Sequence, residues 1–144
     1  MTWTKIELPG DRRDPITQID AFVNGGDGFL YIGADTGALL QLDPKKGRVK
    51  LAARPSASRG FGALSPPVKG RIYGVAGRDE TNEAFAYDLA SGNLVNYGPV
   101  YDSNRKTFAQ RPHELVLSPN RTLYCPETDN FDRQCYFWEI ELKG

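Results

Sequence analysis

Short apolar runs alternate with clusters of Gly, Pro, Asn, Asp and Ser along most of this chain, and none of the runs keeps the spacing of a helix. This pattern predicts strands joined by tight turns, and therefore an all-β fold. Three segments are alike, because each has an apolar run containing tyrosine, then a turn, then a second apolar run. The paired runs are residues 28–33 and 38–44, 70–75 and 84–89, and 121–126 and 135–140. Their tyrosines are Tyr31, Tyr73 and Tyr124.

Further strands extend each repeat beyond its hairpin. A short apolar run precedes the second and third hairpins and ends in each case at Leu-Ser-Pro, residues 64–66 and 117–119. Residues 48–52 and 93–100 follow the first two hairpins after Gly-containing turns, so with the preceding run each unit reads as four strands. The tyrosines lie 42 and 51 positions apart, close to the repeat length of a propeller blade. Residues 28–47 resemble a blade of the quinoprotein-type β-propellers and related families.

The resemblance implies three four-stranded blades, at residues 16–53, 58–100 and 111–142. An antiparallel sandwich with three similar hairpins is the alternative. Propellers usually close with about four to eight blades, so three blades would leave faces and edges uncovered. The third unit also ends without a fourth strand, whereas residues 3–8 alternate like an unassigned strand.

These two observations predict an assembly. Residues 1–9 would act as a clasp strand that completes the third blade of a second chain, and two chains would form a six-bladed ring. The expected partner is thus a second copy in a homodimer. The alternatives are that the chain is a fragment of a longer propeller or the partner of a different chain.

Composition narrows the function classes. The chain has 144 residues, of which 40% are hydrophobic and 25% charged, as expected for one domain with a core. Eighteen basic residues balance eighteen acidic ones, which argues against nucleic-acid or membrane-surface binding driven by net charge. The first residues lack the apolar region of a signal peptide, so a cytoplasmic location is the default expectation, although the compartment stays unknown.

The single histidine, His113, is the candidate catalytic group, with Arg111 beside it at the start of the third unit. A histidine can act as acid or base near neutral pH, and an arginine can hold a carboxylate. This pair would suit a lyase or hydrolase acting on a glycan that contains uronic acid. Some propeller polysaccharide lyases are similar in using a histidine with arginine and tyrosine. The alternative is a histidine that makes a structural hydrogen bond at a strand start.

The candidate binding groups are polar residues on one rim of the predicted blades, because loops on a rigid scaffold commonly carry ligands. They are Arg59, Arg78, Glu127, Asp129, Asn130 and Arg133. Arg59 comes from the start of a first strand, and the others come from the turns between second and third strands. The oxygen-rich turn at residues 126–133 could be considered for calcium, but its spacing matches no EF-hand, and a solvated turn explains it equally well. No metal or other cofactor is expected. The sequence thus predicts a binding scaffold for a small polar or glycan ligand or a protein, with the glycan lyase or hydrolase as the alternative.

The two cysteines allow a prediction of register. If Tyr124 pairs with Tyr136, as Tyr31 would pair with Leu40, then Cys125 lies directly opposite Cys135. Their Cα atoms would be about 4.5–5.5 Å apart, within disulfide range. Because no secretion signal is evident, two reduced thiols are expected.

Overall fold

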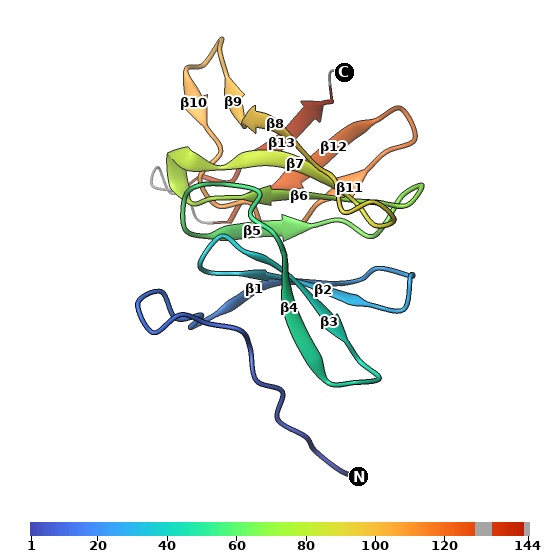
Figure 1. The fold of residues 1–144 in the computed structure, drawn as a ribbon. Helices are drawn as coiled ribbons and strands as arrows, with labels where there is room; N and C mark the ends of the chain where they lie inside the picture. Colours follow the sequence, from blue (N-terminus) through green and yellow to red (C-terminus); the bar gives the residue numbers. More distant parts are fainter. Residues whose placement is uncertain (129–133, 143–144) are drawn as a thin grey trace.

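A computed structural model describes residues 1–128 and 134–142. Within these residues the chain folds into antiparallel sheets with one short 3-10 turn and no α-helix. Three sheets follow one another in chain order (Figure 1). The first sheet has the order β1 (Ile19–Asn24), β2 (Leu30–Ala34), β3 (Leu39–Asp43) and β4 (Arg48–Ala53). The second has β5 (Phe61–Leu64), β6 (Arg71–Ala76), β7 (Glu83–Asp88) and β8 (Leu94–Pro99).

The third sheet has three strands in the described part of the chain. They are β11 (Val116–Leu117), β12 (Thr122–Pro126) and β13 (Phe137–Glu141), with β13 at the outer edge. Along the chain, a small hairpin of β9 (Tyr101–Asp102) and β10 (Thr107–Phe108) lies between the last strand of the second sheet and the first strand of the third. The 3-10 turn η1 (Asp79–Thr81) joins β6 to β7. The all-β prediction is confirmed, but the β9–β10 hairpin was not anticipated.

An aspartate closes the same kind of turn in three hairpins. Asp43 accepts hydrogen bonds from the backbone amides of Lys45 and Lys46, at 3.0 and 3.2 Å. Asp88 accepts from the amide of Ser91 at 2.9 Å, and Asp102 from that of Asn104 at 2.9 Å. Such side-chain bonds favour a turn over continued strand, which is why β3, β7 and β9 end at these aspartates.

The repeated tyrosines show how the sheets stack. Tyr31 is fully buried against the second sheet, where its ring centroid lies 5.8 Å from that of Tyr87. Tyr73 is buried on the opposite face of the second sheet, in the core shared with the third sheet. Each of these tyrosines therefore faces the sheet that follows it, and the sheets pack face to face in sequence order.

Two glycines make that packing possible. A Cβ on Gly33 would lie 2.2 Å from the Phe61 ring, and one on Gly74 would lie 2.3 Å from the Phe85 ring. The two phenylalanines meet edge to face at 5.8 Å between the first and second sheets. A side chain at either glycine would push apart rings that the core requires, so glycine is needed there for space.

The third tyrosine has a different environment. Tyr124 lies on the face of the third sheet that points away from the second sheet, with its ring 5.9 Å from that of Phe137. Phe137 is 68% exposed and Val116 is 58% exposed. This outer face therefore presents apolar side chains that no following sheet covers within the described residues.

The predicted register of the third hairpin was wrong. Tyr124 pairs with Glu139 and Cys125 with Trp138, while Cys135 precedes β13 and is exposed; both thiols are free. In the first hairpin Tyr31 pairs with Gln41, one position from the prediction. The observed register turns Trp138 and Ile140 toward the second sheet, whereas the predicted register would turn Glu139 and Glu141 there. Burying two carboxylates costs far more than burying an indole and an isoleucine, so packing selects the observed register.

Residues 1–9 form no strand in the single chain and extend away from the sheets (Figure 1). Trp3 is 88% exposed. Leu8 is the exception, because it packs with Ile16 against the outer face of the first sheet. The clasp prediction concerns a second chain and stays a prediction. In the described part of the chain no helix is long and apolar enough to span a membrane.

Candidate functional site

The first strands of the three sheets line one hollow, which we name the inner-strand hollow. It has a volume of about 360 Å³. Its lining residues are Asp20, Ala21 and Phe22 from β1, Ala63, Leu64 and Pro66 from β5 and its end, and His113, Glu114, Leu115 and Val116 leading into β11. Residues far apart in the sequence thus meet at the inner edge of the stacked sheets.

The hollow combines carboxylates with exposed apolar surface. Phe22 is 60% exposed and lies in the same hollow as Asp20, His113 and Glu114. Partial burial raises the pKa of Asp20, the nearby Asp35 adds to the rise, and the charge of Arg78 opposes it. Acceptors beside an open aromatic face suit a ligand with hydroxyl groups and an apolar face.

His113 is held in place through its backbone. Its amide donates to the carbonyl of Pro126 at 3.0 Å, and the Thr128 amide donates to the carbonyl of Arg111 at 3.0 Å. Pro112, between them, is buried against Gly62. His113 lines the inner-strand hollow, whereas Arg111 does not belong to its lining. The structure therefore places His113 and its sequence neighbour Glu114 in one hollow with Asp20, a residue that the sequence had not grouped with them.

Arg59 is engaged by acids of its own chain. Its guanidinium pairs with Asp14 and lies 3.5 Å from a carboxylate oxygen of Asp35. Burial works against the ionisation of Asp35, but bonds from the Thr17 hydroxyl and amide and the Gln18 amide, with the charge of Arg59, outweigh it and lower its pKa. This cluster anchors residues 14–18 to the first sheet, so the charge of Arg59 is largely compensated.

The remaining predicted binding residues have separate positions. Arg78 is exposed at the start of η1, close enough to Asp20 to influence its pKa. Glu127 is only 1% exposed, and its carboxylate accepts a hydrogen bond from the Gln110 amide at 2.5 Å. Asp129, Asn130 and Arg133 lie outside the described residues. In residues 1–128 and 134–142, no three His, Cys, Asp or Glu side chains are grouped to hold a metal ion.

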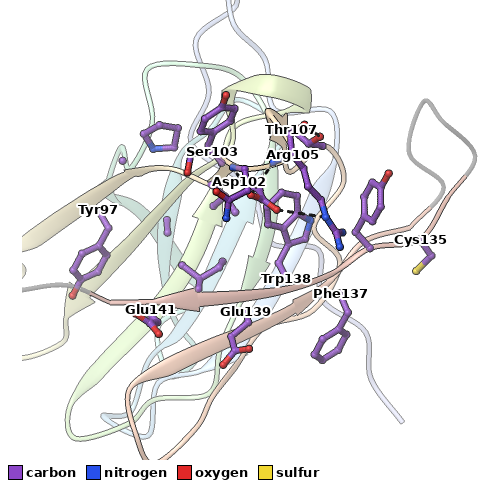
Figure 2. A pocket seen from close by; sticks show the side chains of 18 residues that line it. Tyr97, Asp102, Ser103, Arg105, Thr107, Cys135, Phe137, Trp138, Glu139 and Glu141 are labelled. Atoms are coloured by element: carbon purple, nitrogen blue, oxygen red, sulfur yellow. Dashed lines mark hydrogen bonds and ion pairs between the residues drawn. The ribbon is translucent and has the colours of Figure 1, made fainter.

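A second hollow runs along β13, and we name it the edge slot. It has a volume of about 890 Å³ and lies between β13 and the segment from the end of β8 through β9 toward β10 (Figure 2). Trp138 points from β13 toward Asp102 and Arg105 on the opposite wall. The indole nitrogen of Trp138 is buried and has no hydrogen-bond partner among the residues that the structure describes. Sequence reasoning missed the slot, although the absent fourth strand of the third unit was its signal.

Comparisons with known proteins inform the fold alone. No family model and no curated protein matches the chain. Among solved structures, the extracellular domain of the one-component system BT4673 from B. thetaiotaomicron, a propeller-like domain, matches 94% of this chain with a TM-score of 0.63 and 14% identity. Puromycin hydrolase, a propeller-containing peptidase, matches 76% with a TM-score of 0.52 and 21% identity. A puromycin hydrolase mutant complexed with PGG matches 85% with a TM-score of 0.54 and 19% identity.

The matched regions are small parts of those proteins. This chain spans 17% of the BT4673 domain, and 19% and 17% of the two puromycin hydrolase chains. At these identities the likeness supports stacked antiparallel sheets, as in propeller-like domains. It does not indicate that this chain shares an activity with those proteins.

Proposed function

We propose that this chain is a three-bladed segment of a β-propeller, that two copies form a six-bladed ring, and that the ring acts as a binding scaffold. The observation that carries the proposal is the inner-strand hollow, to which all three sheets contribute their first strand or the segment leading into it. In a propeller the first strands surround the axis, where ligands commonly bind. The likeness to propeller-like solved structures supports the same arrangement.

Uncovered surface supports the assembly. The outer face of the third sheet exposes Val116 and Phe137 beside Tyr124, at the position where the first two sheets are each followed by another sheet. Apolar patches of this kind are typical of association surfaces. Light scattering of the purified chain should give about 32 kDa, twice the 16.0 kDa of one copy. A mass of one copy over the whole accessible concentration range would refute the assembly.

The ligand that best fits the inner-strand hollow is a neutral, hydroxyl-rich glycan. Asp20 and Glu114 offer acceptors for hydroxyl groups, and the exposed ring of Phe22 offers a stacking surface for a sugar. The same carboxylates would repel a uronic acid. We expect a neutral cello-oligosaccharide to bind more tightly than an oligogalacturonate in calorimetric titration.

Variants make this test specific. Phe22→Ala and Asp20→Asn should each weaken binding of the cello-oligosaccharide about five- to fiftyfold, the loss expected for one stacking or charged hydrogen-bond contact. Asp11→Asn, on an exposed turn away from the hollow, is the matched control and should leave affinity unchanged. Absence of binding by both sugars at millimolar concentration would refute the glycan assignment.

A glycan lyase or hydrolase is the second candidate, because His113 shares the hollow with two carboxylates. An imidazole beside carboxylates could exchange a proton with a bound sugar. Incubation with oligogalacturonate tests both reactions, since β-elimination creates an unsaturated product that absorbs in the ultraviolet, whereas hydrolysis releases new reducing ends without that absorbance. If the native chain turns the substrate over and His113→Ala binds it without turnover, the enzymatic function is favoured. If the native chain shows no turnover, the binding-scaffold function is favoured.

A further inference from the structure

The edge slot lies where the third sheet lacks a strand that the other two sheets have. In those sheets the third strand is followed by β4 or β8 on its outer side. In the third sheet β13 is the outermost strand of the described chain, and residues 135–141 form one wall of the slot. An uncovered strand edge offers a row of backbone donors and acceptors to an added strand.

We infer that residues 2–7 of a second copy pair antiparallel with β13 in the edge slot, as the fourth strand of the third sheet. This inference rests on the self-assembly proposed above and identifies the contact that would join the copies. Residues 2–7 are all exposed and belong to no strand in the single chain. In residues 2–7 the β-branched side chains of Thr2, Thr4 and Ile6 alternate with other side chains, so the two faces of a strand would differ.

The order of strands along the chain is consistent with residues 2–7 as the added strand. Between the first and second sheets, residues 54–60 lead from the outer strand β4 to the inner strand β5. In the proposed contact, residues 8–18 would likewise lead from the added strand to the inner strand β1 of the same copy. Every junction between neighbouring sheets of these two copies would then run from an outer strand to the next inner strand.

The segment belongs to a second copy and not to the same chain. Leu8 packs against the first sheet, so residues 1–7 start from that end of the molecule. Figure 1 shows the amino terminus and β13 at opposite ends of the stacked sheets. In a two-fold dimer the third sheet of one copy would meet the first sheet of the other, next to Leu8.

The side chains on the two strands complement each other in one register. If Lys5 lies across from Glu139, then Ile6 lies across from Trp138. On the outer face this puts an ammonium group against a carboxylate, with Glu141 nearby on the same face of β13. On the inner face Ile6 joins the apolar side chains of Trp138 and Ile140.

The unpaired indole nitrogen of Trp138 also fits this register. Thr4 would lie on the same face as Ile6, across from Ile140, and its hydroxyl could reach the neighbouring indole. A buried N–H without an acceptor is costly, so an added strand that brings one is favoured. The edge slot thus offers apolar, charged and hydrogen-bonding groups that residues 2–7 match.

Deletion of residues 2–7 is the first test, because it keeps Leu8 on the first sheet and leaves the sheets intact. By light scattering the native chain should be a dimer and the deletion variant a monomer. A synthetic peptide of residues 1–8 should then bind the deletion variant, with a change in tryptophan fluorescence. A deletion variant that remains dimeric would overturn this inference and leave self-assembly standing, whereas a monomeric native chain would overturn both.

A charge exchange tests the register. Lys5→Glu should raise the dimer dissociation constant about two- to fivefold, the range of an exposed ion pair. Adding Glu139→Lys to the same chain should restore it, because the two charges are then exchanged across the contact. Lys45→Glu, the same charge change in the exposed β3–β4 turn, is the control and should have no effect. Failure of Glu139→Lys to restore association would refute the proposed pairing.

Discussion

Replacing Tyr31, Tyr73 and Tyr124 by alanine, one at a time, should show by the loss of stability which sheet faces are covered by another sheet of the same chain and which face is open. Tyr31 and Tyr73 are 0% and 6% exposed and face a following sheet, whereas Tyr124 faces outward on the third sheet. The three residues occupy equivalent places in their sheets, so the substitution is chemically the same each time. Only the packing around it differs.

The expected losses follow from that packing. Removing a fully buried aromatic ring costs about 3–5 kcal/mol, so Tyr31→Ala and Tyr73→Ala should each lower the free energy of unfolding by that amount. Tyr31 also donates to Asp27 at 2.8 Å and accepts from Gln41 at 2.9 Å. Tyr31→Phe keeps the ring and removes only these bonds, so it should cost about 1–3 kcal/mol. Tyr124→Ala should change unfolding of the single chain far less.

Urea unfolding of the full-length chain, at a concentration where light scattering reports one copy, would measure these differences. With a slope of about 1–3 kcal/mol per molar urea, the alanine variants at Tyr31 and Tyr73 should lose more than about 1 M in midpoint. If they do not fold, Tyr31→Phe still distinguishes the sites. A loss for Tyr124→Ala as large as that for Tyr31→Ala would mean that the outer face is already covered in one chain, and the reasoning would be wrong.

Two further predictions concern titratable groups. Because burial raises the pKa of Asp20 in the folded chain, its ionisation opposes folding, so Asp20→Asn should raise Tm at pH 7 by about 1–2 °C for this solvent-screened carboxylate. The gain should vanish as the pH falls below 3.8, the ordinary value for Asp, and an equal gain at pH 3 would contradict it. For the cysteines, burial raises the pKa of the Cys125 thiol to about 12, while Cys135 is exposed. Iodoacetamide at pH 8 should therefore label Cys135 at least tenfold faster, with Cys125 reacting only after unfolding, and equal rates by mass spectrometry would contradict this.

Local features of the fold were predictable because they depend on nearby residues. The turns that end β3 and β7 could be anticipated, since Asp43 begins the run Asp-Pro-Lys-Lys-Gly and Asp88 begins the run Asp-Leu-Ala-Ser-Gly, each of which ends in a glycine. The apolar runs around Tyr31, Tyr73 and Tyr124 marked three strands that the structure contains. By contrast, the β9–β10 hairpin was missed, because its strands are only two residues each and are held by a Tyr101–Phe108 ring contact at 4.5 Å.

The candidate site was predictable only in part. His113 could be singled out as the sole histidine, but its proximity to Asp20 depends on the stacking of sheets whose strands are distant in sequence. Arg59 was predicted as a ligand-binding residue, yet the first sheet and the segment before it supply Asp35 and Asp14 to its guanidinium. Ion pairs between residues so far apart in sequence cannot be recognised from the order of residues alone.

Alternation and turn chemistry by themselves determined that this chain is built of antiparallel hairpins in three similar units, because both act between residues close in sequence. The tertiary structure decided which way each strand faces. Trp138 and Ile140 lie inward and Glu139 and Glu141 outward because the second sheet offers an apolar surface on one side of β13. A shift of register by an odd number of residues would turn Glu139 and Glu141 inward instead. Burying these carboxylates is costly only once the sheets stack, so the stacking selects the register in which Cys125 pairs with Trp138 and not with Cys135.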